Sequence, residues 1–160
     1  MKGTIIFLAL AFTFFAPGIC HAQYNFPLVE LEKLCGKNSS DFDTYVMEKD
    51  YTIQSKTSTQ ILKIYKSDKK SADGTTNVIT RYQVPNAASK IEFSTTDKKY
   101  YLDVKSKLAS MGFKLLNDEV KTINGAQAQV YHYSNGPFQL SLGTYSTEAN
   151  WYIVDINGNL

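Results

Sequence analysis

Short segments in which apolar and polar residues alternate, each bounded by turn residues, run through most of this chain and limit its possible folds. The clearest two are 114–122 and 126–133, which are joined by Asn124-Gly125. That dipeptide between alternating segments is a strong signal of a two-residue β-hairpin. Alternation with a period of two predicts strands that bury one face. The chain is therefore expected to form antiparallel sheet.

Helical features appear in three other places. Further strands are predicted at 51–55, 60–66, 77–84, 90–95, 138–145 and 151–156, and helices at 27–35, 40–50 and 97–111. Ser40 with Asp43 three residues later has the spacing of a capping box, and Gly112 suits the residue that ends the third helix. Helices combined with antiparallel strands predict the α+β class.

The order of these elements indicates an internal duplication. Residues 28–95 and 96–160 each contain a helix followed by up to four strands. An offset of about 62 residues superposes Asp41 on Asp103, Tyr51 on Phe113, Val78 on Leu140 and Ile91 on Ile153. Two tandem helix-plus-antiparallel-meander repeats predict a curved antiparallel sheet with the helices packed on one face. The alternative is that unrelated α+β meanders share this order of elements.

The stretch Asp41-Phe42-Asp43-Thr44-Tyr45-Val46, closing on Lys49-Asp50-Tyr51, resembles one found in small exported bacterial proteins of unknown function. The tandem layout is similar to that of secreted β-lactamase inhibitor proteins. These resemblances imply an exported α+β fold, and they supply no active-site residue.

The N-terminus has the layout of a secretory signal peptide. Met1 and Lys2 precede an apolar run from Ile5 to Ala16, and Cys20-His21-Ala22 follows a Pro-Gly break. The run is too short to span a membrane, which takes about 20 residues. We therefore expect residues 1–22 to be a signal peptide, residues 23–160 to be a single α+β domain, and the location to be secreted or periplasmic.

The charge pattern argues against a nucleic-acid partner. The chain has 17 Lys and Arg residues against 15 Asp and Glu residues, and Arg81 is its one arginine. Nucleic-acid-binding domains usually gather Lys and Arg on one face, and no such cluster is visible. No segment after residue 22 is apolar enough to predict an integral membrane span.

Few residues suit catalysis or metal binding. Beyond residue 22, Cys35 is the one cysteine and His132 the one histidine. One of each cannot fill a tetrahedral zinc site without carboxylates, so no metal, no cofactor and no enzymatic activity is predicted. Cys35 lies at helical spacing from Leu28 and Leu31, which favours burial. An intermolecular disulfide or a reactive thiol is the alternative.

Aromatic residues supply the candidate binding surface. All eleven tyrosines follow residue 22, and tyrosine and tryptophan favour interfaces. If the apolar residues of 138–145 face the helices, the Gln/Tyr faces of the neighbouring strands are expected on the open side of the sheet. The predicted binding residues are Tyr65, Arg81, Gln127, Gln129, Tyr131, Tyr133, Tyr145 and Trp151. The alternative is that these rings complete the core or form ordinary cross-strand pairs.

The sequence thus predicts an exported, non-enzymatic binding protein that presents a tyrosine-rich sheet face to a protein partner or a small ligand. An inhibitor or immunity protein is one version of this hypothesis. A structural or assembly module of the cell envelope is a second hypothesis, and a hydrolase with a carboxylate site is a third.

Overall fold

The computed structural model describes residues 23–54, 59, 61–67, 74–83, 89–123, 125–147 and 149–158. The predicted signal peptide, 1–22, lies outside the described residues. The elements are α1 (Leu28–Cys35), α2 (Ser39–Met47), β1 (Tyr51–Ile53), β2 (Leu62–Ser67), β3 (Asn77–Tyr82), β4 (Lys90–Thr95), α3 (Lys98–Lys107), β5 (Lys114–Ile123), β6 (Ala126–Ser134), β7 (Phe138–Ser146) and β8 (Asn150–Gly158).

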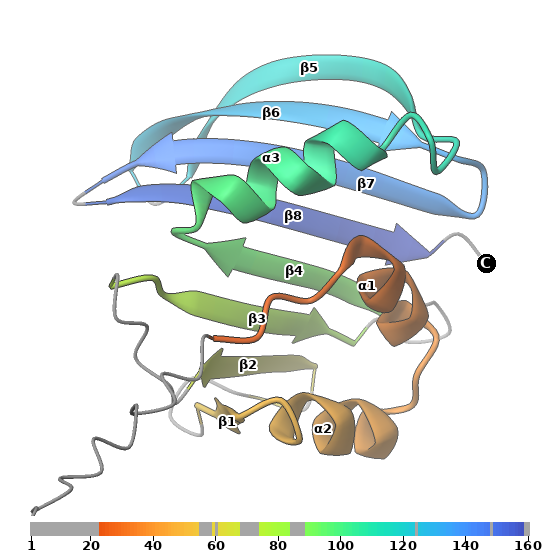
Figure 1. Ribbon diagram of the computed structural model, residues 1–160, viewed down its shortest axis with the longest axis vertical. Coiled ribbons are helices and arrows are strands. Elements are labelled where there is room, and N and C mark those ends of the chain that lie inside the picture. Colours follow the sequence, from red (N-terminus) through yellow and green to blue (C-terminus); the bar gives the residue numbers. More distant parts are fainter. Residues whose placement is uncertain are drawn as a thin grey trace, which may run out of the picture.

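The strands form one eight-stranded antiparallel sheet in the order β1-β2-β3-β4-β8-β7-β6-β5. Helices combined with this sheet confirm the predicted α+β class. The central pair is β4 with β8, in which Phe93 lies opposite Val154. This pair joins the first four strands to the last four, as Figure 1 shows.

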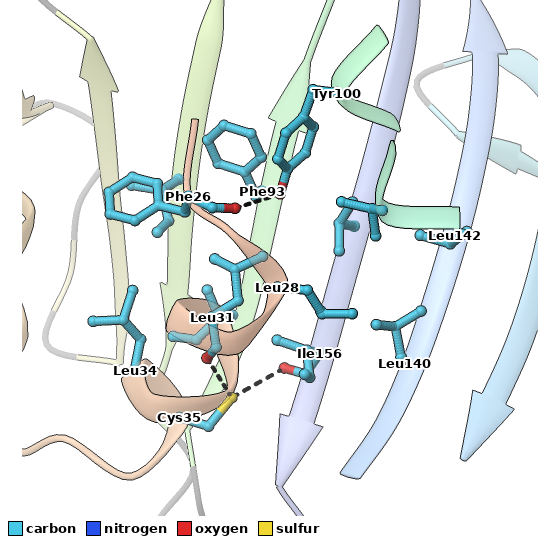
Figure 2. Close-up of a cluster of buried hydrophobic side chains, with 14 of the residues drawn as sticks. Phe26, Leu28, Leu31, Leu34, Cys35, Phe93, Tyr100, Leu140, Leu142 and Ile156 are labelled. Atoms are coloured by element: carbon cyan, nitrogen blue, oxygen red, sulfur yellow. Dashed lines mark hydrogen bonds between the residues drawn. The ribbon is translucent and has the colours of Figure 1, made fainter. Parts of the chain in front are cut away.

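One face of the sheet, here called the helical face, carries the main hydrophobic core. Phe93 and Ile156 on the central strands are fully buried in the same cluster as Leu31 of α1, Val46 of α2 and Val104 of α3. Figure 1 shows α1 and α3 in front of the sheet and α2 beside β1 at one end of it, and Figure 2 shows α1 residues next to the strands. The other face is here called the open face.

The helix ends differ in two details from the sequence-based expectation. Asn38, not Ser40, caps α2, because its side-chain oxygen accepts a hydrogen bond of 2.9 Å from the Asp41 amide. The predicted capping box at Ser40 is therefore wrong. The third helix, α3, ends at Lys107 rather than at the predicted Met111. The predicted closing turn follows it: Gly112 has a φ of 80°, and the Phe113 amide donates to the Leu108 carbonyl at 3.0 Å.

The predicted offset of about 62 residues, an even number, does not match the faces on which the strand residues lie. Ile91 is buried on the helical face, whereas Ile153 lies opposite Ser94 and Gly143 on the open face. Side chains of a strand alternate between faces, so the predicted even offset does not superpose residues that lie on the same face of the sheet. A register shift in β5 between Leu115 and Asn117 marks one place where an extra residue enters.

Cys35 is buried, as the helical spacing predicts. Its thiol donates to the carbonyl oxygens of Leu31 and Ile156, at 3.4 and 3.7 Å (Figure 2). Burial raises the pKa of this thiol to about 12, so little thiolate exists near neutral pH. This environment does not favour a reactive cysteine.

Candidate functional site

The predicted placement of Tyr131 and Tyr133 on the open side is wrong. These residues lie directly opposite Leu142 and Leu140, whose side chains belong to the core of the helical face. The Lys105 ammonium of α3 lies 4.6 Å from the centre of the Tyr131 ring. Both tyrosines therefore stand beside α3, where they remain partly exposed.

Tyr65 and Arg81 are also misplaced by the prediction, because both are buried on the helical face. Tyr65 is 0% exposed, packs against the Phe42 ring and donates its hydroxyl proton to Asp43. Arg81 is 2% exposed and donates to the Ser89 hydroxyl and the Lys37 carbonyl. These hydrogen bonds are made within the protein, and among the described residues Arg81 Nη1 is buried with no hydrogen-bond partner. Their burial assigns both residues to the fold rather than to a recognition surface.

The four remaining predicted residues are divided between the faces. Gln127 and Gln129 lie on the same face of β6 as Tyr131, which is the helical face. The Gln129 amide donates to Asp118 at 2.9 Å. Tyr145 and Trp151 lie opposite each other on the open face. All four line a shallow depression of about 530 Å³ near the ends of β6, β7 and β8. The structure thus brings half of the predicted set together, without forming the single open face that was expected.

A more enclosed hollow lies on the open face and is here called the open-face pocket. It has a volume of about 330 Å³. Its lining residues are Tyr82, Lys90, Glu92, Lys121, Ile123, Val130, Ser141, Gly143, Tyr145, Ile153 and Asp155. Tyr145 is the one predicted binding residue among them.

The pocket exists because the sheet curls. Its walls include Tyr82 on β3 and Lys121 on β5, with four other strands between them in the sheet order. In a flat sheet, strands five places apart would be separated by about 24 Å. One pocket can contact both only if the open face is concave. Figure 1 shows the corresponding bend of β5.

Two carboxylates meet on the floor of this pocket. Glu92 of β4 lies directly opposite Asp155 of β8, in the central pair of the sheet. Burial raises the pKa of both carboxyls, and the charge of Asp155 raises the pKa of Glu92 further. Like charges placed opposite each other destabilise a sheet, so this pair opposes folding.

The two carboxylates have different partners. Asp155 forms an ion pair with the Lys90 ammonium at 2.7 Å. Among the described residues, Glu92 accepts hydrogen bonds from hydroxyl groups instead, from Ser94 at 3.1 Å and from Tyr82 at 3.4 Å. Burial, followed by the charges of Glu92 and Asp155, raises the pKa of Tyr82 to about 12. Glu92 is therefore the carboxylate with the weaker compensation.

A second charged group borders the pocket. The Glu119 carboxylate accepts from Lys121 at 3.0 Å and from His132 Nε2 at 2.8 Å. The other ring nitrogen of His132 lies 2.8 Å from the Ser141 hydroxyl. Hydrogen bonds from Lys121 and His132 lower the pKa of Glu119.

The sequence holds only a weak signal for Glu92 and Asp155. Each is a single acid between two apolar residues, in Ile91-Glu92-Phe93 and Val154-Asp155-Ile156. An acid on the polar face of a strand is common, and only the pairing of β4 with β8 brings these two together. That pairing joins distant segments and could not be deduced from local pattern.

The described residues offer neither a metal site nor a membrane-spanning helix. They contain no group of three or more His, Cys, Asp or Glu side chains placed to hold a metal ion. Within the same residues, every helix falls short of the length and apolarity that crossing a membrane requires. Comparison with protein-family models, with curated proteins and with solved structures finds no significant match to this chain.

Proposed function

We propose that this protein is an exported, non-enzymatic binding protein whose open-face pocket takes a ligand bearing an organic cation, an amine or a guanidinium group. The observation that carries this proposal is the Glu92–Asp155 pair, two desolvated carboxylates opposite each other with one lysine paired to one of them.

The energetic argument starts from the cost of the empty pocket. Removing an ionised carboxylate from water is unfavourable unless a cation or several donors compensate it. Among the described residues, Glu92 accepts hydrogen bonds from hydroxyl groups only, and the Lys90 charge that also lowers its pKa is ion-paired with Asp155. A bound cation would offset the unfavourable free energy of the buried Glu92 charge. The relief of this free energy on binding would then contribute to the affinity for the ligand. Such perturbed acids are concentrated at functional sites.

The shape of the pocket agrees with a small group. A volume of about 330 Å³ lies near the lower end of the usual range for ligand sites. The Tyr82 ring already has the Lys90 ammonium 5.0 Å from its centre, so this ring is placed to contact a cation. The ligand is a free small amine or a Lys or Arg side chain presented by another protein. The second source corresponds to an inhibitor or immunity role.

A duplication would explain why the two acids meet. The strand order is symmetric about the β4–β8 pair, with four strands on each side. In both halves a residue with positive φ, Asp50 at 63° and Gly112 at 80°, precedes a buried aromatic residue, Tyr51 or Phe113. In this proposal two helix-plus-meander units share one helical face, and Glu92 and Asp155 stand next to the axis that relates them.

Calorimetric titration tests the proposed ligand class. One arm uses free arginine, lysine and spermidine, and the other uses a short Lys/Arg-containing peptide, with acetylated lysine as the uncharged comparison. Binding should be lost in Glu92→Gln and preserved in Glu48→Gln, an acid exposed at the end of α2. Absence of heat with every cation, or equal binding by both variants, would contradict the proposal.

A carboxylate hydrolase is the second candidate, and the same pair of acids favours it. Two carboxyl groups in different environments can divide the roles of general acid and general base. Assays with chromogenic glycosides, esters and peptides decide between the two functions. Turnover that is abolished by both Glu92→Gln and Asp155→Asn would establish the hydrolase and remove the binding proposal.

A further inference from the structure

The strand β5 forms one edge of the sheet and offers a long backbone for pairing. Within the part of the chain that the structure describes, β5 pairs with β6 on one side only. The opposite edge strand, β1, has 3 residues, whereas β5 has 10. Most side chains of β5 are exposed. Long exposed edges pair with other strands unless something protects them.

The backbone groups that face outward can be identified from the register. Two residues separate the closing pair Ile123 and Ala126, and a two-residue hairpin is closed by a hydrogen-bonded pair. Since hydrogen-bonded and non-hydrogen-bonded pairs alternate, Glu119 and Lys121 direct their backbone groups toward β6. Asp118, Val120 and Thr122 therefore direct theirs toward the free edge.

We propose that β5 pairs antiparallel with β5 of a second copy of this chain, on a two-fold axis through Val120. This register places Val120 opposite Val120 of the partner chain, as a hydrogen-bonded pair made by outward-facing backbone groups. Val120 is 63% exposed in the single chain, so the contact buries an apolar side chain that is otherwise in water.

Charge and strand length select this register over its neighbours, since an axis through Thr122 would pair only residues 121–123, where β5 ends. Around Val120, Glu119 of each copy lies opposite Lys121 of the other, which makes two equivalent ion pairs on the open face. A two-fold axis through Asp118, Glu119 or Lys121 would instead place identical charges directly opposite each other, and such pairs are destabilising. A lysine on an edge strand usually discourages pairing with other strands. In this one register, Lys121 instead forms an ion pair with Glu119 of the other copy.

The dimer has a defined extent and a defined geometry. The ladder runs from Asn117 to Ile123, since the irregularity between Leu115 and Asn117 interrupts it at one end. Equivalent residues keep the same face across an antiparallel pair, so the two open faces would turn toward the same side of a continuous sheet. The proposal does not depend on the ligand of the open-face pocket.

Analytical ultracentrifugation of the purified protein tests the pairing by charge exchange. The wild-type protein should show a monomer–dimer equilibrium. Glu119→Lys and Lys121→Glu should each weaken the dimer about tenfold, because two attractive pairs become repulsive in each variant. The double variant Glu119→Lys/Lys121→Glu should restore it. Circular dichroism confirms that each variant is folded, because Glu119 also contacts His132.

A spin label provides an independent measurement of the register. Labelled Val120→Cys should show strong dipolar broadening, because opposite Cα atoms of an antiparallel pair lie about 5.5 Å apart. Labelled Leu102→Cys, at an exposed position on α3, should show none. A monomer at every accessible concentration, a double variant no better than the single ones, or an unbroadened Val120→Cys spectrum would overturn the proposal.

Discussion

Replacing Gly143 by alanine should make the protein more stable and its open-face pocket smaller. Gly143 is buried in the middle of β7 and lines this pocket. A Cβ atom there would lie 3.7 Å from Ile153 Cβ and 3.7 Å from Val130 Cγ2, which are ordinary van der Waals contacts. Its φ lies outside the left-handed region, so alanine fits without backbone strain.

The expected size of this effect follows from two contributions. Alanine reduces the conformational entropy of the unfolded chain, which is worth about 0.4–1 kcal/mol. Burial of the added methyl group is worth about 0.8 kcal/mol when it is complete. The free energy of unfolding should therefore rise by about 1 kcal/mol, and the midpoint of thermal unfolding by about 2–4 °C for a chain of this size.

Urea unfolding of the wild type and of Gly143→Ala measures the change directly. The matched control is Gly136→Ala, in an exposed turn where φ is 92°, which should cost about 1 kcal/mol because alanine is strained there. Titration with arginine should show weaker binding by Gly143→Ala, since the methyl group occupies ligand space. A loss of stability in Gly143→Ala would refute the reasoning, because it would mean that the space beside Ile153 and Val130 does not exist.

Four further predictions concern the fold and the carboxylate pair. Phe93→Ala should cost about 3–5 kcal/mol in urea unfolding, because this ring is 0% exposed and packs edge-on against Tyr100 at 5.1 Å. Asn38→Ala should cost about 1 kcal/mol, whereas Ser40→Ala should change little, and the reverse order would contradict the capping geometry. The Cys35 thiol should resist iodoacetamide at pH 8 until urea unfolds the protein, since burial raises its pKa to about 12, and rapid native alkylation would disprove its burial. Glu92→Gln should stabilise the protein progressively from pH 4 to pH 7, relative to the wild type. Because the pKa of Glu92 is raised in the folded state, the stability that its protonated form contributes is fully present below the unfolded pKa of about 4.3. That stability is lost as the pH rises through the folded pKa. Equal stability of the two proteins across this range would show that Glu92 is well solvated.

The sequence was most informative where local chemistry decides the structure. The predicted strand at 90–95 has the observed bounds of β4, and Asn124-Gly125 correctly predicted the hairpin between β5 and β6. Gly112 correctly predicted the left-handed residue in the turn that follows α3. In each case one dipeptide, one glycine or one alternating run was sufficient, because the constraint is local.

The candidate site was harder to predict, because it depends on register between strands. In β6, Ala128 and Val130 face one side while Tyr131 and Tyr133 face the other, so either face of this strand could have met the helices. The pairing of Tyr133 with Leu140 fixes the choice, and it is set by the connection to β7. Arg81 shows a related difficulty, since an arginine is usually exposed. Its burial depends on hydrogen bonds to the Ser89 hydroxyl and the Lys37 carbonyl, which local sequence does not reveal.

The pKa of Glu92, measured by carboxyl ¹³C NMR with and without arginine, tests the central claim most directly. The account predicts a pKa above the ordinary glutamate range in the free protein, as burial beside Asp155 requires, and a fall in that pKa when the cation binds next to the carboxylate. An ordinary pKa in the free protein, or a raised pKa that no amine or guanidinium compound lowers, would contradict it.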